Sequence, residues 1–129
     1  MDSDILVVDD SAAIRKILTR VLRQTGMAIQ TIHEAGDGQD ALAVMALHRI
    51  DLVLSDINMP KMDGLQLLAS LKASPQWQKI PVVMITTEGG ETKVAEAVRL
   101  GAAGYVRKPF TADQIKEKLV GILESAAAL

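Results

Sequence analysis

The chain has 129 residues, 49% of them hydrophobic and 23% charged, which is typical of one globular domain with a buried core. A formal net charge of -2 argues against direct nucleic-acid binding through a broad basic surface, and the absence of cysteine excludes disulfide bonds and thiol chemistry. The acidic start, MDSDILVVDD, lacks the pattern of a secretion signal and no later run could span a membrane, so we expect a cytoplasmic protein without membrane insertion.

Four short apolar runs predict strands that helices cover on both faces, because their hydrophobicity is continuous rather than alternating. They are residues 5–8, residues 52–54, residues 82–85 and a weaker run around Tyr105 and Val106. A fifth strand, over residues 29–35, alternates with polar residues and is expected at a less buried edge of the sheet.

Two helices are predicted between the first three strands. Apolar residues spaced three and four apart predict the first helix, and Gly26 is expected to cap its end. Residues 37–38, an Asp-Gly pair, then turn the chain into a second helix that holds Ala41, Leu42 and Met45. The apolar face of the first helix is predicted to comprise Ile14, Ile17, Leu18, Val21 and Leu22.

Three further helices complete the pattern. The third runs from about residue 64 to residue 73, the fourth stops near Gly101, and the fifth opens with the capping-box spacing of Thr111 and Gln114. Their apolar faces are predicted to comprise Leu65, Leu68 and Leu71 in the third, Val94, Ala97 and Val98 in the fourth, and Ile115, Leu119, Ile122 and Leu123 in the fifth.

Strands that alternate with helices in one small domain predict an α/β fold. We expect a doubly wound, five-stranded parallel sheet of flavodoxin-like order 2-1-3-4-5, with five helices on its two faces. Residues 1–125 are assigned to this domain. The low-complexity segment 126–129 is interpreted as a tail left by cloning.

Five polar residues follow strands at one edge of the predicted sheet, where open α/β sheets bind ligands: Asp9, Asp10, Asp56, Thr86 and Lys108. Three carboxylates placed together raise one another's pKa unless a cation neutralises them. Oxygen ligands without a nearby histidine or cysteine favour Mg²⁺, with Mn²⁺ as a substitute. The sequence therefore predicts a divalent-metal site at this edge.

The charge on Lys108 beside a metal implies an anion between the two cations, and a phosphoryl group carried by Asp56 meets that requirement. The metal and Lys108 would stabilise charge on the transferring phosphoryl oxygens, so Asp56 would act as the nucleophile. The hydroxyl of Thr86 would then bind a phosphoryl oxygen. Asp63 is interpreted as a structural turn and cap residue. We expect the two histidines, His33 and His48, to lie at the surface.

Four motifs occur in order along the chain: DD at 9–10, SDINMPKMDG at 55–64, TTE at 86–88 and GYVRKPF at 104–110. With them the chain resembles the receiver domain of two-component response regulators, and within that family the single-domain chemotaxis type. The resemblance covers residues 4 to about 124. It departs from the chemotaxis type at Gly90 and Glu91, where that type carries basic residues.

This resemblance implies roles for the site residues. Asp56 is the expected phosphoacceptor, and Lys108 is expected to pair with its phosphoryl group and to precede a cis peptide bond to Pro109. The expected Mg²⁺ contacts are Asp9, Asp10, Asp56 and the backbone carbonyl of Asn58.

The resemblance also implies a conformational switch. Thr86 is expected to move toward the phosphoryl group, and Tyr105 is expected to turn inward, although Tyr105 could instead be a plain core aromatic residue. Asn58 and Glu88 are expected to tune the lifetime of the phosphoryl group.

As a signalling domain, such a receiver catalyses only its own phosphorylation and dephosphorylation. The expected phosphodonor is a histidine kinase or a phosphotransfer domain that docks on the first helix. The expected target is a protein that binds the face made by the fourth helix, the fifth strand and the fifth helix, and the unphosphorylated chain is expected to be a monomer.

Three alternatives remain open. The chain could be a receiver cut from a longer regulator with a separate output domain. It could be an Mg²⁺-dependent aspartyl-phosphate phosphatase, although such enzymes place a second aspartate where this chain has Asn58. It could also be a flavodoxin-like nucleotide binder, although DDSAAIR after the first strand would repel phosphate.

Overall fold

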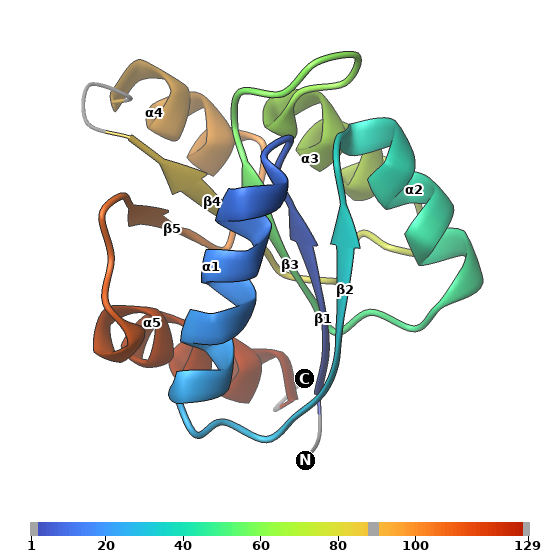
Figure 1. Cartoon of the computed structure of the whole chain (residues 1–129). Helices are drawn as coiled ribbons and strands as arrows, with labels where there is room; N and C mark the ends of the chain where they lie inside the picture. The colour runs from blue at the N-terminus through green and yellow to red at the C-terminus, as the bar shows by residue number, and fades with distance from the viewer. Residues whose placement is uncertain (1–2, 88–90, 128–129) are drawn as a thin grey trace.

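The computed structural model describes residues 3–87 and 91–127, in which five strands alternate with five helices (Figure 1). All strand pairs are parallel and the order is β2-β1-β3-β4-β5, so the predicted fold class and strand order are confirmed. In chain order the elements are β1 Ser3–Val8, α1 Ala12–Gln24, β2 Ile29–Ala35, α2 Gly38–Leu47, β3 Leu52–Asp56, α3 Gly64–Lys72, β4 Val82–Thr86, α4 Glu91–Arg99, β5 Gly104–Arg107 and α5 Ala112–Ala127.

Two hydrophobic layers enclose the sheet. On one face, α1 and α5 bury Leu18, Leu22, Ile115 and Leu119 against the strands. On the other face, α2, α3 and α4 bury a second cluster that includes Ala41, Met45, Leu67, Leu68, Leu71 and Ala97. The continuous apolar strands are explained by this double cover, because β3 and β4 are almost wholly buried.

The helix ends follow from local side-chain chemistry. Asp63 and Gln66 form a reciprocal capping box at the start of α3, which confirms the structural role predicted for Asp63. Thr111 and Gln114 exchange the same pair of bonds at the start of α5. Gly26 follows α1 with a φ of 75°, a conformation that glycine adopts without strain.

Two residues predicted to lie on apolar faces are exposed. Ile17 in α1 has 45% of its surface exposed and Val98 in α4 has 57%. These predictions were wrong because the sheet and the neighbouring helices cover a narrower stripe of each helix than the apolar spacing suggests. In α3, Leu67 is fully buried whereas Leu65 is only partly buried.

Three remaining expectations concern the two histidines, the C-terminal segment and membrane spans. His48 is exposed and His33 is half-buried, and their rings stack with centroids 4.3 Å apart. Helix α5 continues through Ala127, so it includes two residues of the segment interpreted as a tail. None of the helices in the described part of the chain combines the length and apolarity needed to cross a bilayer.

Candidate functional site

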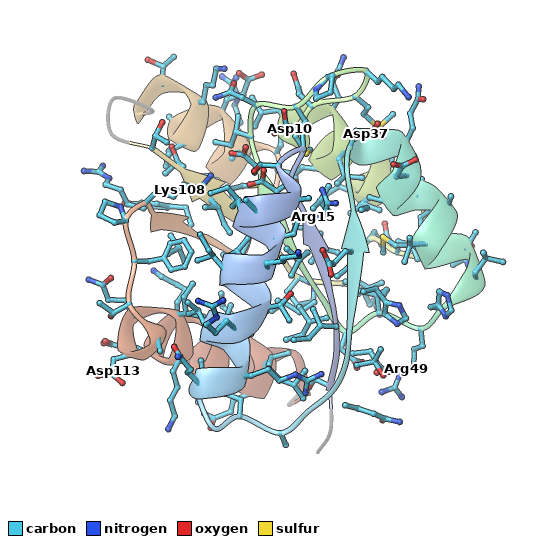
Figure 2. The ribbon with its side chains drawn as sticks, viewed as in Figure 1. Asp10, Arg15, Asp37, Arg49, Lys108 and Asp113 are labelled. Carbon is cyan, nitrogen blue, oxygen red and sulfur yellow. The ribbon has the colours of Figure 1, made fainter. Side chains whose placement is uncertain are left out.

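Three carboxylates meet at the end of the sheet where the strands finish. Asp9 directly follows β1 and Asp56 is the last residue of β3, and these strands pair in register up to Val8 and Ser55. Asp9, Asp10 and Asp56 each offer an oxygen within 4.8 Å of the others. Figure 2 shows Asp10 near the N-terminal end of α1 and Lys108 on the same side of the molecule.

Asp9 is the buried member of this cluster, with 1% of its surface exposed. One of its carboxylate oxygens accepts a hydrogen bond from the backbone N–H of Ser11 at 2.9 Å, and the other lies 3.5 Å from the Nζ of Lys108. A buried carboxylate is tolerated when it is paired and hydrogen-bonded in this way. Arg15 donates to the backbone carbonyl of Asp9 at 2.6 Å and pairs with Glu34 at 3.0 Å, which holds the end of β1 in place.

Asp56 lies beside the same cation. Its Oδ1 accepts from the backbone N–H of Ile57 at 2.8 Å and is 3.9 Å from the Nζ of Lys108. Burial raises the pKa of Asp56, the charge of Lys108 opposes that rise, and the charges of Asp9 and Asp10 add to it. One lysine therefore pairs with two of the three acids, and the cluster retains an excess of negative charge.

Thr86 and Lys108 are joined through their backbones. The backbone N–H of Lys108 donates to the carbonyl of Thr86 at 2.7 Å, and the peptide bond between Lys108 and Pro109 is cis, as expected. Thr86 is buried, and its hydroxyl donates to the carbonyl of Thr87 at 3.1 Å. The sequence prediction that Asp56, Thr86 and Lys108 share one edge of the sheet is confirmed.

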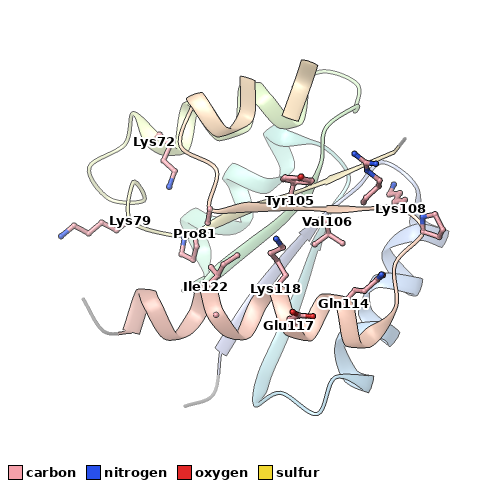
Figure 3. Close-up of a pocket in the computed structure, with 14 residues that line it drawn as sticks. Lys72, Lys79, Pro81, Tyr105, Val106, Lys108, Gln114, Glu117, Lys118 and Ile122 are labelled. Atoms are coloured by element: carbon pink, nitrogen blue, oxygen red, sulfur yellow. The ribbon is translucent and has the colours of Figure 1, made fainter. Parts of the chain in front are cut away.

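Tyr105 is not a core aromatic residue, because 39% of its surface is exposed. Its ring lies 5.6 Å from the Nζ of Lys118, which projects from α5. Both residues line a groove of about 1210 Å³ between β5, α5 and the segment before β4 (Figure 3). Lys72, Lys79 and Arg107 also line it, so its rim is rich in cations.

The two residues expected to tune the phosphoryl lifetime fall in different parts of the chain. Asn58 is exposed, and its side-chain oxygen accepts a hydrogen bond from Lys93 at the start of α4. Glu88 lies outside the described residues. Sequence reasoning missed Lys93 and Arg15, whose contacts join residues far apart in the chain, and it missed the close packing of Gly64 against Asp56.

The donor set fits a hard divalent cation. Three carboxylates converge, Asp9 is buried, and Lys108 neutralises only part of their charge. All three ligand groups are oxygens, which Mg²⁺ prefers, and the exposed position of Asp10 leaves room for metal-bound water.

Comparisons with known proteins identify the family. Residues 5–120 match the family described as Response regulator receiver domain. Chemotaxis protein CheY-3 of Vibrio cholerae serotype O1 is 41% identical over 120 residues, which cover 93% of this chain and 91% of that protein.

Solved structures agree with this match. The structure of chemotaxis protein CheY4 of Vibrio cholerae superimposes with a TM-score of 0.84 at 32% identity, covering 95% of this chain and 99% of that one. NtrX from Brucella abortus superimposes with a TM-score of 0.89 at 35% identity, covering 99% of this chain but 28% of that one. By its sequence, its fold and its cluster of acids beside a lysine, this chain belongs to the response regulator receiver domain family.

Proposed function

We propose that this chain is a stand-alone, chemotaxis-type receiver whose Asp56 accepts a phosphoryl group from a phosphohistidine. The observation that carries the proposal is the position of Lys108, whose Nζ lies 3.5 Å from Asp9 and 3.9 Å from Asp56. A carboxylate oxygen of Asp56 attacks phosphorus, the phosphorus–nitrogen bond of the donor breaks, and its electron pair returns to the donor imidazole. Lys108 stabilises the charge on the transferring oxygens.

The residues that would hold Mg²⁺ are Asp9, Asp10, Asp56 and the backbone carbonyl of Asn58. A bound cation would neutralise negative charge on the phosphoryl oxygens. The chain itself supplies the positioning: Ser11 and Arg15 hold Asp9, and Ile57 holds Asp56 through its backbone N–H.

We assign the conformational response to Thr86 and Tyr105. Met84 of β4 pairs with Tyr105 of β5, so their side chains point to the same face of the sheet. Thr86 lies two residues after Met84 in β4, so its side chain points to that face as well. In this structure the hydroxyl of Thr86 binds the carbonyl of Thr87, and Tyr105 is exposed. On phosphorylation, Thr86 turns its hydroxyl to a phosphoryl oxygen, and Tyr105 moves into the space that opens.

The target surface in this proposal is the face of α4, β5 and α5, and the groove around Tyr105 and Lys118 forms its part along β5 and α5 (Figure 3). The phosphodonor is a histidine kinase or phosphotransfer domain that docks at α1, whose exposed Ile17 lies between the cations Lys16 and Arg20. The unphosphorylated chain is proposed to be a monomer.

The deciding experiment is the intact mass of the protein after incubation with acetyl phosphate, with and without Mg²⁺. The expected result is one added phosphoryl group that requires Mg²⁺ and is absent from Asp56→Asn. Asp113→Asn is the matched control, because this exposed residue of α5 lies far from Asp10 in Figure 2. Uptake by Asp56→Asn at the wild-type rate would overturn the assignment of Asp56.

A second candidate is a receiver that controls an output domain in a longer regulator. The observation that favours it is the match to NtrX, in which the equivalent receiver is 28% of the chain. Both candidates share the chemistry of Asp56, so the mass experiment tests phosphoryl uptake in either case. A binding experiment is needed to distinguish a stand-alone receiver from one that controls an output domain. Phosphorylation-dependent binding of this chain to a separate protein would favour the stand-alone form.

A further inference from the structure

A lysine of α4 reaches across to the loop that follows the phosphoacceptor. The Nζ of Lys93 donates a hydrogen bond to the side-chain oxygen of Asn58, which lies two residues after Asp56. Both side chains are exposed. The bond links α4 to the loop between β3 and α3, two segments 35 residues apart in the chain.

The helix dipole does not favour a cation at this position. Lys93 is the third residue of α4, and a positive charge in the first turn of a helix opposes the helix dipole. The favourable placement of a lysine is the last turn, where α4 carries Arg99. The position of Lys93 is therefore better explained by its contact with Asn58 than by the helix dipole.

The chemistry that this contact can affect is loss of the phosphoryl group, so the inference rests on the proposed function. In that step the oxygen of a water molecule attacks phosphorus, and the bond between phosphorus and the carboxylate oxygen of Asp56 breaks. The carboxylate is restored, phosphate leaves, and the water's proton passes to phosphate or solvent. An acceptor near the phosphorus accelerates this step when it orients the water.

We infer that Lys93 is a positioning residue that prolongs the phosphorylated state by holding the side-chain oxygen of Asn58. While that oxygen accepts a charge-assisted hydrogen bond from Lys93, it is a poorer acceptor for the attacking water. Release of the bond frees Asn58 to orient that water. The contact thus couples the position of α4 to the rate of hydrolysis.

The test compares the decay of the phosphorylated protein after removal of acetyl phosphate. Lys93→Ala is expected to decay about threefold to tenfold faster than wild type, a range set by the modest strength of exposed polar contacts. Lys93→Arg, which retains a charged donor, is expected to restore most of the lifetime. Arg99→Ala removes the same charge from the other end of α4 and is expected to decay at the wild-type rate.

A double-mutant cycle separates the contact from a general effect of charge. In an Asn58→Ala background, Lys93→Ala should change the decay rate no further. An acceleration that persists in that background, or equal decay of wild type and Lys93→Ala, would overturn the inference.

A second readout needs no phosphorylation. In the unphosphorylated protein, Lys93→Ala should shift the side-chain amide NMR signals of Asn58, whereas Arg99→Ala should leave them in place. Unmoved signals would exclude the contact. If wild type takes up no phosphoryl group, the proposed function fails together with this inference; if it does and the decay rates are equal, this inference alone fails.

Discussion

Gly64 and Asp56 approach so closely that a Cβ on Gly64 would lie 2.1 Å from the backbone carbonyl oxygen of Asp56. The N–H of Gly64 also donates to the carbonyl of Ile57 at 2.8 Å. The start of α3 is therefore packed directly against the end of β3. Any side chain at position 64 must displace the backbone that carries Asp56.

We expect Gly64→Ala to lower the free energy of unfolding by about 2 kcal/mol or more, because the atom it meets is backbone that must shift. Urea denaturation measures this loss, and phosphoryl uptake should fall with it. Gly121→Ala is the matched control, since a Cβ there meets nothing within 4 Å and should stabilise α5 by about 0.5–1 kcal/mol. Equal stability of Gly64→Ala and wild type would contradict the packing described.

Asp56→Asn should stabilise the protein in the absence of Mg²⁺. The folded pKa of Asp56 is raised above 3.8, chiefly by burial, so its ionised form is disfavoured in the folded state. Wild type consequently loses stability as the pH rises through the folded pKa, and the neutral amide does not. We expect a gain in the free energy of unfolding at pH 7 that disappears below pH 3.8.

Thermal unfolding between pH 3 and pH 8 in EDTA measures this difference, with Asp113→Asn as the control for loss of an exposed acid. Added Mg²⁺ should raise the melting temperature of wild type more than that of Asp56→Asn. A gain that grows as the pH falls would have the wrong sign for a raised pKa.

Lys108→Met should raise the pKa of Asp56 further. The charge of Lys108 lowers that pKa, and its Nζ lies 3.9 Å from the carboxylate. A titration of the Asp56 carboxyl carbon by NMR, without Mg²⁺, should therefore show a midpoint at higher pH than in wild type. Lys116→Met, at an exposed position of α5, should leave the midpoint unchanged. An unshifted midpoint in Lys108→Met would remove the electrostatic role assigned to this lysine.

Thr19→Val should stabilise α1. The hydroxyl oxygen of Thr19 is buried and has no hydrogen-bond partner among the described residues. Replacing it by a methyl group should add about 1 kcal/mol to the free energy of unfolding, measured by urea denaturation. Thr25→Val provides the contrast, because the hydroxyl of Thr25 donates to Leu22 at 2.6 Å and accepts from Met27 at 3.2 Å. That variant should lose about 1 kcal/mol, and the same sign in both variants would contradict the prediction.

The sequence by itself determined the sheet and the composition of the candidate site. The edge strand at Ile29–Ala35 was predicted with its observed bounds, because the period of side chains along a strand is local information. Likewise the capping residues Asp63 and Thr111 act on residues only three positions away. Asp9, Asp56 and Lys108 converge because parallel strands all end at one edge.

Tertiary structure decided which of the residues in these elements are buried and which of them are in contact with one another. Ile17 and Val98 fit the apolar spacing of a helix but are exposed. Their burial would depend on neighbouring helices and strands, whose positions a local sequence pattern does not specify. Tyr105 is exposed rather than buried for the same reason, as it lies on the edge strand β5.

The contacts of Gly64 with Asp56 and of Lys93 with Asn58 join segments whose distance is set by packing alone. Periodicity and capping act over a few residues, whereas these contacts depend on how α3 and α4 pack against the sheet. The residues that meet at the site could therefore be predicted from residue types and strand ends. The residues that position it required the folded chain.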